Sequence, residues 1–243
     1  MELSLAIRSN DVRLAASLHY PVHNIVAEKP HCRWPLIVIC QGLASNRIGV
    51  DRLFVEAADF WGENGYLTLT FDFAGCGEST GEYGAGGLED MVAQTRHVLD
   101  YAWQLESVDP SRIILLGHGL GGTTAALTAA FDKRIKSLVL WAAIAEPLGD
   151  TAGVIPPLRH AGRFAGDVLL LHGMDDIVVP VNQCSLFQVC YWNRSDGKCD
   201  KIILPKADHT FSNSGHRRRL YNETVHWLNN LEKQKKDREA WTY

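Results

Sequence analysis

The spacing of apolar positions along the chain predicts short strands that alternate with longer helices. Residues 36–40 are apolar at every position, a pattern that favours a strand covered on both faces, as in a parallel sheet. In residues 47–64 and 88–105, apolar side chains recur at i, i+3 and i+4, which predicts amphipathic helices. Further strands are expected at residues 66–71, 113–116, 137–142, 166–172 and 201–204. Further helices are expected at residues 123–130, 181–192 and 216–231.

The first residues follow a different pattern. Residues 3–8 and 12–20 are two short runs of apolar and β-branched residues, and residues 9–11, Ser-Asn-Asp, supply turn chemistry between them. We expect an antiparallel hairpin at the edge of the sheet. The strand–helix alternation that follows predicts an α/β fold with helices on both faces of a mostly parallel sheet. The length of 243 residues and the hydrophobic content of 46% suit one domain, residues 1–243.

A glycine-rich stretch lies where the expected strand at 113–116 turns into a helix. Gly117 and Gly121 have the spacing of a nucleophile elbow, G-x-S-x-G, in which a tight turn lifts a catalytic side chain above the carboxyl end of a parallel sheet. The middle position is Gly119, so the residue that would carry the nucleophile has no side chain. Glycine adopts a strained turn with little penalty, but it cannot form an acyl intermediate.

Four further motifs occur in a fixed order along the chain. They are Gln41-Gly42, D-x-x-G-x-G-x-S at 72–79, HG-x-x-D-x-x-VP at 172–180, and Asp208-His209. Together with the glycine-rich stretch, they resemble the landmarks of the α/β-hydrolase superfamily, in its small esterase and acyl-hydrolase (feruloyl esterase-like) branch. That branch usually has GHSxGG at the elbow. The resemblance covers nearly the whole chain and implies the α/β-hydrolase fold, with a central sheet of about eight strands.

The resemblance implies a catalytic triad from which the nucleophile is missing. His209 would be the base, and Asp176 would be the carboxylate that orients it, with Asp175 as the alternative acid. Gly119 holds the nucleophile position. Cys76 is a substitute nucleophile only if it lies within hydrogen-bond reach of His209.

The resemblance also implies the surroundings of the site. Backbone N–H groups of Leu43 and Leu120 would form the oxyanion hole, which does not depend on the missing side chain. Gln41, which replaces a histidine common in the family, His118 and Cys76 would be substrate-binding residues around the pocket.

The segment at 144–163 lies where related esterases carry a cap. It is short and is broken by prolines and glycines, so we expect a minimal cap in place of a folded helical lid. The pocket would then be open, or covered by a homodimer partner or another protein.

Composition and charge narrow the function classes. The net charge of −4 and the scattered basic residues give no reason to expect a nucleic-acid partner. The six cysteines form no C-x-x-C pair, and the glycine runs lack the lysine of a phosphate-binding loop, so we expect no metal and no cofactor. Neither a secretory leader nor an apolar segment long enough to span a membrane is recognised, so we expect no membrane partner and a cytoplasmic location.

Three hypotheses about function remain open at this point. The first is a non-covalent general-base enzyme, a lyase, cyclase or hydrolase-like protein, that uses His209 and Asp176 on an ester, thioester or other carbonyl compound. The second is a catalytically degenerate binding or scaffold protein. The third is a serine carboxylic-ester hydrolase whose nucleophile at position 119 was changed in the laboratory.

Overall fold

The chain folds around one eight-stranded sheet. The computed structural model describes residues 1–21, 33–148 and 158–241. The strands lie in the order β1-β2-β4-β3-β5-β6-β7-β8. β1 and β2 form the expected antiparallel hairpin, β2 pairs antiparallel with β4, and all other neighbours are parallel. The strands are β1 (Glu2–Ser9), β2 (Val12–His19), β3 (Trp34–Cys40), β4 (Leu67–Phe71), β5 (Val108–His118), β6 (Ile135–Trp141), β7 (Asp167–Gly173) and β8 (Cys199–Leu204).

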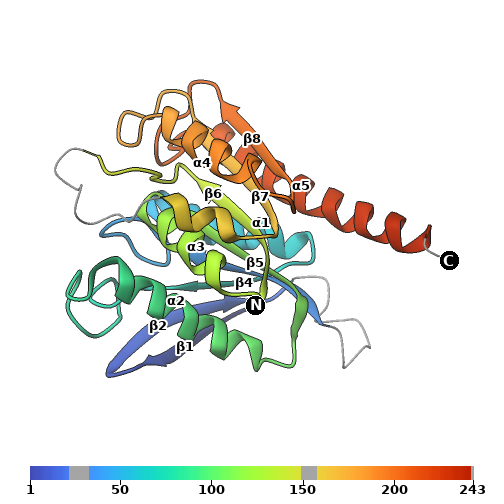
Figure 1. Ribbon diagram of the computed structural model, residues 1–243. Coiled ribbons are helices and arrows are strands. Elements are labelled where there is room, and N and C mark those ends of the chain that lie inside the picture. The colour runs from blue at the N-terminus through green and yellow to red at the C-terminus, as the bar shows by residue number, and fades with distance from the viewer. Residues whose placement is uncertain (22–32, 149–157, 242–243) are drawn as a thin grey trace.

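Helices cover both faces of this sheet, as the strand–helix alternation predicts (Figure 1). One face packs against α2, α3 and α4, and the other packs against α1 and α5. The α-helices are α1 (Leu53–Glu63), α2 (Gly87–Trp103), α3 (Leu120–Phe131), α4 (Asn182–Trp192) and α5 (Ser214–Ala240). The short 3-10 helices are η2 (Val50–Arg52) and η4 (Leu158–Arg163). The expected α/β fold class is therefore confirmed.

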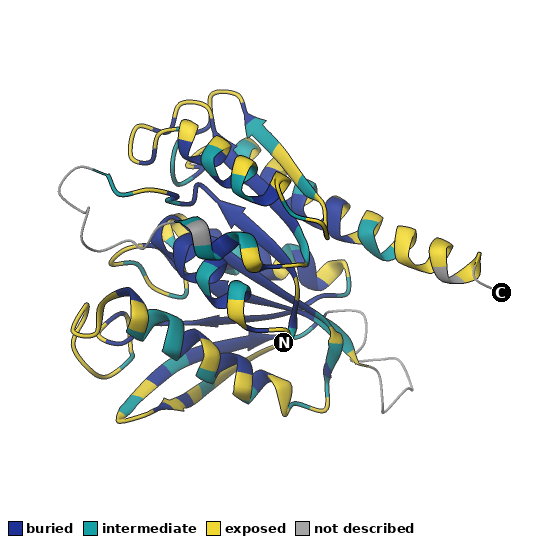
Figure 2. Ribbon diagram, in the orientation of Figure 1, coloured by how far each residue is buried: buried dark blue, intermediate teal, exposed yellow. Residues whose placement is uncertain are grey.

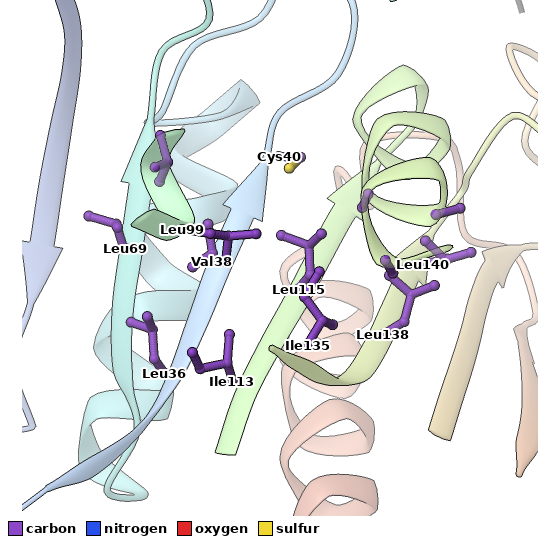
Figure 3. Packing of buried hydrophobic residues seen from close by; sticks show 14 of the residues in the cluster. Leu36, Val38, Cys40, Leu69, Leu99, Ile113, Leu115, Ile135, Leu138 and Leu140 are labelled. Carbon is purple, nitrogen blue, oxygen red and sulfur yellow. The ribbon is translucent and has the colours of Figure 1, made fainter. Parts of the chain in front are cut away.

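Alternate residues of the central strands enter two separate cores. Leu36 and Val38 of β3 point to the α2–α3 side, while Ile37 and Ile39 point to the α1–α5 side. Figure 3 shows the first of these layers, in which side chains from β3, β4, β5 and β6 meet. Because helices cover both faces of the sheet, the central strands are buried along most of their length (Figure 2). This burial accounts for the uninterrupted apolar runs in the sequence.

Three element boundaries differ from the expected ones by five residues or more. Helix α1 begins only at Leu53, because Asp51 and Arg52 have left-handed backbone angles (φ 49° and 63°) that interrupt the helix. Strand β5 begins earlier, at Val108, because that residue pairs with Trp34 of β3. Helix α5 continues to Ala240, past the expected end at 231, through charged turns that project away from the sheet (Figure 1).

The region expected to replace the cap is described in part. Residues 149–157 of the segment 144–163 lie outside the described residues, and the far end of the segment forms η4. Across the described ranges, none of the helices combines the length and the apolar character needed to cross a membrane.

Candidate active site

The backbone at Gly119 has the geometry of a sharp strand-to-helix turn. Gly119 lies between the end of β5 and the start of α3 with φ 56° and ψ −122°, a conformation that strains residues with a Cβ. The neighbouring glycines are required by close backbone contacts. A Cβ on Gly117 would lie 2.2 Å from the carbonyl oxygen of Gly121, and one on Gly121 would lie 2.2 Å from that of Cys40. Close backbone contacts thus account for Gly117 and Gly121, whereas at Gly119 only the positive φ favours glycine.

His209 and Asp176 form a hydrogen-bonded pair at the carboxyl edge of the sheet. His209 follows β8 and Asp176 follows β7, and Nδ1 of the imidazole lies 2.8 Å from Oδ2 of the carboxylate. Because an ionised carboxylate can only accept, Nδ1 carries the proton and Nε2 presents a lone pair. The pair therefore has the tautomer that a general base requires.

The other contacts of Asp176 hold it as an anion. Its Oδ1 accepts the backbone N–H groups of Val178 and Val179 at 2.9 and 2.8 Å, and Nε2 of His172 lies 3.3 Å from its Oδ2. Burial would raise the pKa of the Asp176 carboxyl, but hydrogen bonds from His172, His209 and the Val179 amide outweigh burial and lower the pKa well below its usual range. Asp175, the alternative acid, is exposed, so the geometry favours Asp176.

Gly119 lies beside the free nitrogen of His209. A Cβ at position 119 would lie 3.4 Å from Nε2 and 3.6 Å from Cε1 of His209, which is ordinary van der Waals contact. The backbone N–H of Gly119 donates to the carbonyl of Trp141 at 3.0 Å, which ties the turn to β6. The site therefore has room for a small side chain, and for a small reactant group, between the turn and the imidazole.

Leu43 and Leu120 occupy the two positions expected for oxyanion donors. Leu43 follows Gly42 in the loop after β3, and Leu120 is the first residue of α3. The first N–H groups of a helix have no acceptor within the helix, so the Leu120 N–H is free of intrahelical pairing. Gln41 is fully buried, and its side-chain amide donates to the carbonyl of Ser45 at 2.9 Å, which closes the loop that carries Leu43.

His118 lies between the loop after β3 and the loop that carries His209. Its Nε2 donates to the backbone carbonyl of His209 at 2.9 Å, and the two rings lie 4.7 Å apart. A Cβ on Gly42 would lie 3.3 Å from its Nδ1. Burial, together with the nearby imidazole of His209, lowers the pKa of His118 to about 4, so this residue is neutral near pH 7.

Cys76, the proposed substitute nucleophile, and Ser79, the last residue of the 72–79 motif, are held by contacts of their own. Burial raises the pKa of the Cys76 thiol, which packs in the core beside Gln41. The Ser79 hydroxyl donates to the Asp72 carbonyl at 2.7 Å and accepts the N–H of Ala15 at 2.8 Å. Neither Cys76 nor Gln41 is among the residues that line the cavity described next.

An apolar cavity of about 400 Å³ opens beside Gly119. His118, His209, Leu43 and Leu120 lie in its wall. The other described residues that line it are mostly apolar and include Val50, Leu53, Phe54, Ile144 and Val178. Its volume lies within the range typical of small-molecule sites. Among the residues that the structure describes, no group of three or more His, Cys, Asp or Glu side chains is placed to hold a metal ion.

Two contacts that support the loop after β3 were missed by the sequence analysis. The fully buried carboxylate of Asp72, after β4, pairs with Arg47, which also pairs with the exposed Glu78. The hydroxyl of Tyr83 accepts the backbone N–H of Ala44 at 3.0 Å. The partners in both contacts lie far apart in sequence. The D-x-x-G motif that contains Asp72 was the one available signal.

Comparisons with known protein families agree with this architecture. A model of the alpha/beta hydrolase fold matches residues 35–162, and a model of the prolyl oligopeptidase family matches residues 144–235. The chain is 31% identical over 140 residues to the quorum-quenching protein AidA of Acinetobacter baumannii, covering 56% of this chain and 42% of that protein. It is 37% identical over 116 residues to an uncharacterized 31.7 kDa protein of Escherichia coli, covering 46% of this chain and 38% of that protein. The alignments thus span less than half the length of these curated relatives.

Solved structures are similar over nearly the whole chain. Est1E from Butyrivibrio proteoclasticus, solved with ferulic acid bound, superposes with a TM-score of 0.76 at 21% identity, covering 95% of this chain and 98% of that one. The esterase domain of a Rhodothermus marinus protein superposes with a TM-score of 0.71 at 18% identity, covering 95% and 98%. At these identities, the similarity concerns the fold.

Proposed function

The chain belongs to the alpha/beta hydrolase fold family, and from this premise we propose that it is an enzyme that acts on an ester, thioester or other carbonyl compound without a covalent acyl intermediate. In this proposal His209, oriented by Asp176, is the general base. The relatives in the family include esterases and peptidases, which supports a carbonyl substrate.

One observation carries the proposal: the free nitrogen of His209 lies beside Gly119. The hydrogen bond from Nδ1 to Asp176 leaves Nε2 with its lone pair, 3.4 Å from where a Cβ at position 119 would be. A protein that had lost all chemistry at this site would have no need of a buried acid, a correctly protonated imidazole and an adjoining apolar cavity. A water molecule or a substrate hydroxyl near Gly119 would be within reach of Nε2.

Hydrolysis would then proceed by direct attack of water. As the water oxygen bonds to the carbonyl carbon, its proton passes to Nε2 of His209, and the carbonyl oxygen becomes an oxyanion. The backbone N–H groups of Leu43 and Leu120 would stabilise this charge, and Asp176 would stabilise the imidazolium. Collapse of the intermediate breaks the bond to the leaving group, which takes the proton from Nε2. A lyase or cyclase would use the same base on a C–H or O–H group of the substrate.

The test is turnover that depends on His209. Aryl esters, thioesters and lactones would be assayed with the unsubstituted chain and with His209→Ala and Asp176→Asn. General-base catalysis contributes about 10²–10⁴-fold, so His209→Ala should lower turnover by at least about 10²-fold. Turnover that survives His209→Ala would overturn the proposal.

A second candidate function is ligand binding without catalysis. The absence of a nucleophilic side chain at Gly119, together with a cavity that is still mostly apolar, favours it. A binding protein would be stabilised by carbonyl compounds that fit the cavity, yet no activity in the assay above would depend on His209. The same variants therefore separate the two functions.

A further inference from the structure

A second, smaller pocket adjoins the main cavity on the other side of Leu43 and Leu120. It has a volume of about 150 Å³, and these two leucines line both spaces. Leu88 and Leu120 form a small apolar cluster, and Met91 of the small pocket and Ile144 of the main cavity pack against it. The two pockets therefore meet at the residues whose N–H groups are the proposed oxyanion donors.

This arrangement determines where the two arms of a carbonyl compound would go. A carbonyl oxygen held by N–H groups of Leu43 and Leu120 would lie where the two pockets share their lining, which would leave one pocket for each substituent. A space of 150 Å³ has room for about five water-sized groups. The main cavity of 400 Å³ has room for an aromatic system or a longer chain.

The small pocket also carries a charge preference. Its walls are apolar at Phe73, Leu88 and Met91, but Asp90 and Glu82 also line it. None of the described residues that line it is a lysine, arginine or histidine. A negatively charged arm would meet two carboxylates and no compensating cation, which disfavours binding electrostatically.

We propose that the substrate or ligand has two unequal arms on its carbonyl group: a large apolar arm for the main cavity, and a short arm without negative charge for the small pocket. This inference rests on the proposed placement of the carbonyl group at Leu43 and Leu120. It does not require that the protein turn the compound over.

Binding of stable amides tests the size of the small pocket. N-(2-naphthylmethyl) amides of acetic, butyric and decanoic acid would be titrated calorimetrically into the unsubstituted chain. Each methylene that fits should strengthen binding about threefold to fourfold, so the butyryl amide should bind about tenfold more tightly than the acetyl amide. The decanoyl amide should bind more weakly than the butyryl amide. A steady gain through decanoyl would overturn the size argument.

A matched pair of variants assigns the gain to the small pocket. Met91→Trp fills that pocket and should abolish the difference between the butyryl and acetyl amides. Val50→Phe narrows the main cavity and should weaken both amides while preserving their ratio. A ratio that is unchanged in Met91→Trp, with a normal unfolding midpoint, would overturn the placement of the short arm.

The charge preference has its own readout, which stays valid if Met91→Trp fails to fold. The succinyl amide should bind at least about fivefold more weakly than the butyryl amide, and the difference should shrink in the Glu82→Gln/Asp90→Asn double variant and at high salt. Equal binding of the succinyl and butyryl amides to the unsubstituted chain would overturn the charge preference. If these preferences hold while no His209-dependent turnover is found, the proposed catalysis fails and the ligand class stands. If His209-dependent turnover is found without these preferences, the proposed catalysis stands and the proposed ligand class fails.

Discussion

The imidazole of His209 faces the backbone of Gly119 at the distance that a nucleophile would need. A Cβ at position 119 would lie 3.4 Å from Nε2, so the hydroxyl of a serine there would be within hydrogen-bond reach of the same nitrogen. In the proposed site, the side chain missing at position 119 is therefore the main difference from a Ser-His-Asp triad.

Gly119→Ser should create a reactive nucleophile. We expect this variant to gain covalent labelling by a fluorophosphonate probe and hydrolysis of short-chain aryl esters, both lost again when His209→Ala is added. Because φ is 56° and ψ is −122°, the added Cβ should also lower the free energy of unfolding by about 1–3 kcal/mol.

Gly119→Ala is the matched control for that experiment. It carries the same backbone strain without a hydroxyl, so it should show a similar loss of stability and no labelling. If Gly119→Ser remains unlabelled while folded, then the imidazole or the oxyanion donors are not placed as proposed.

The fold and the order of the site motifs were predictable from the sequence, for physical reasons. Central strands buried on both faces give apolar runs, and the turn at Gly119 needs glycines on both sides because the backbones approach closely. The spacing of the 172–180 motif favoured Asp176 but left Asp175 as an alternative, because only the fold determines which of two adjacent carboxylates is buried beside His209.

Contacts between distant segments were beyond the reach of sequence patterns. The pairing of Arg47 with Asp72 has no periodicity, and neither has the hydrogen bond from Ala44 to Tyr83. The extension of α5 was missed for a different reason. Beyond residue 231 the helix is largely exposed, so no apolar face marks it, and the high helix propensity of Lys, Glu and Gln sustains it.

The free energy of unfolding should decrease as the pH is lowered, because His118 is buried in its neutral form. Its pKa is about 4 in the folded chain, below the value of about 6.5 expected when it is unfolded. The unfolded state therefore binds more protons between pH 4 and pH 6.5, and stability is lost as the pH falls through this window. From pH 7 to pH 5 the loss attributable to His118 should be about 2 kcal/mol. Urea unfolding at both pH values measures it.

His118→Gln provides the comparison, because its amide can still donate to the carbonyl of His209 but does not titrate. The pH-dependent loss of stability should be smaller in this variant by about the same amount, 2 kcal/mol. The low pKa of Asp176 affects stability mainly below pH 4, where its unfolded form becomes protonated, so it does not interfere at pH 5. An equal loss in both proteins would contradict the prediction.

Asp72→Asn should destabilise the fold far more than a surface substitution would. The carboxylate is fully buried and accepts hydrogen bonds from the backbone and guanidinium of Arg47 and from the N–H of Glu78. An asparagine keeps the shape but leaves a cation without its buried partner, which costs about 3–5 kcal/mol. Glu78→Gln, which removes the exposed partner of the same arginine, should cost less than about 1 kcal/mol. Urea unfolding of both variants measures the loss in the free energy of unfolding. Equal losses in Asp72→Asn and Glu78→Gln would refute the prediction.

Tyr83→Phe should weaken catalysis through the oxyanion loop. The Tyr83 hydroxyl accepts the N–H of Ala44, a residue whose φ of 49° is unfavourable for a side chain with a Cβ. Without that acceptor, the loop loses a restraint next to Leu43, whose N–H is a proposed oxyanion donor. Donors aimed at an oxyanion act mainly in the transition state.

In the Gly119→Ser background, Tyr83→Phe should therefore lower kcat for an aryl acetate by about tenfold, while KM changes by less than about twofold. The effect on kcat is smaller than the 10²–10³-fold loss that follows removal of an oxyanion donor itself. Adding Ala44→Gly, which adopts the left-handed angle without strain, should restore part of kcat. A rise in KM with kcat unchanged would instead mean that Tyr83 acts by contacting the substrate as a wall of the small pocket.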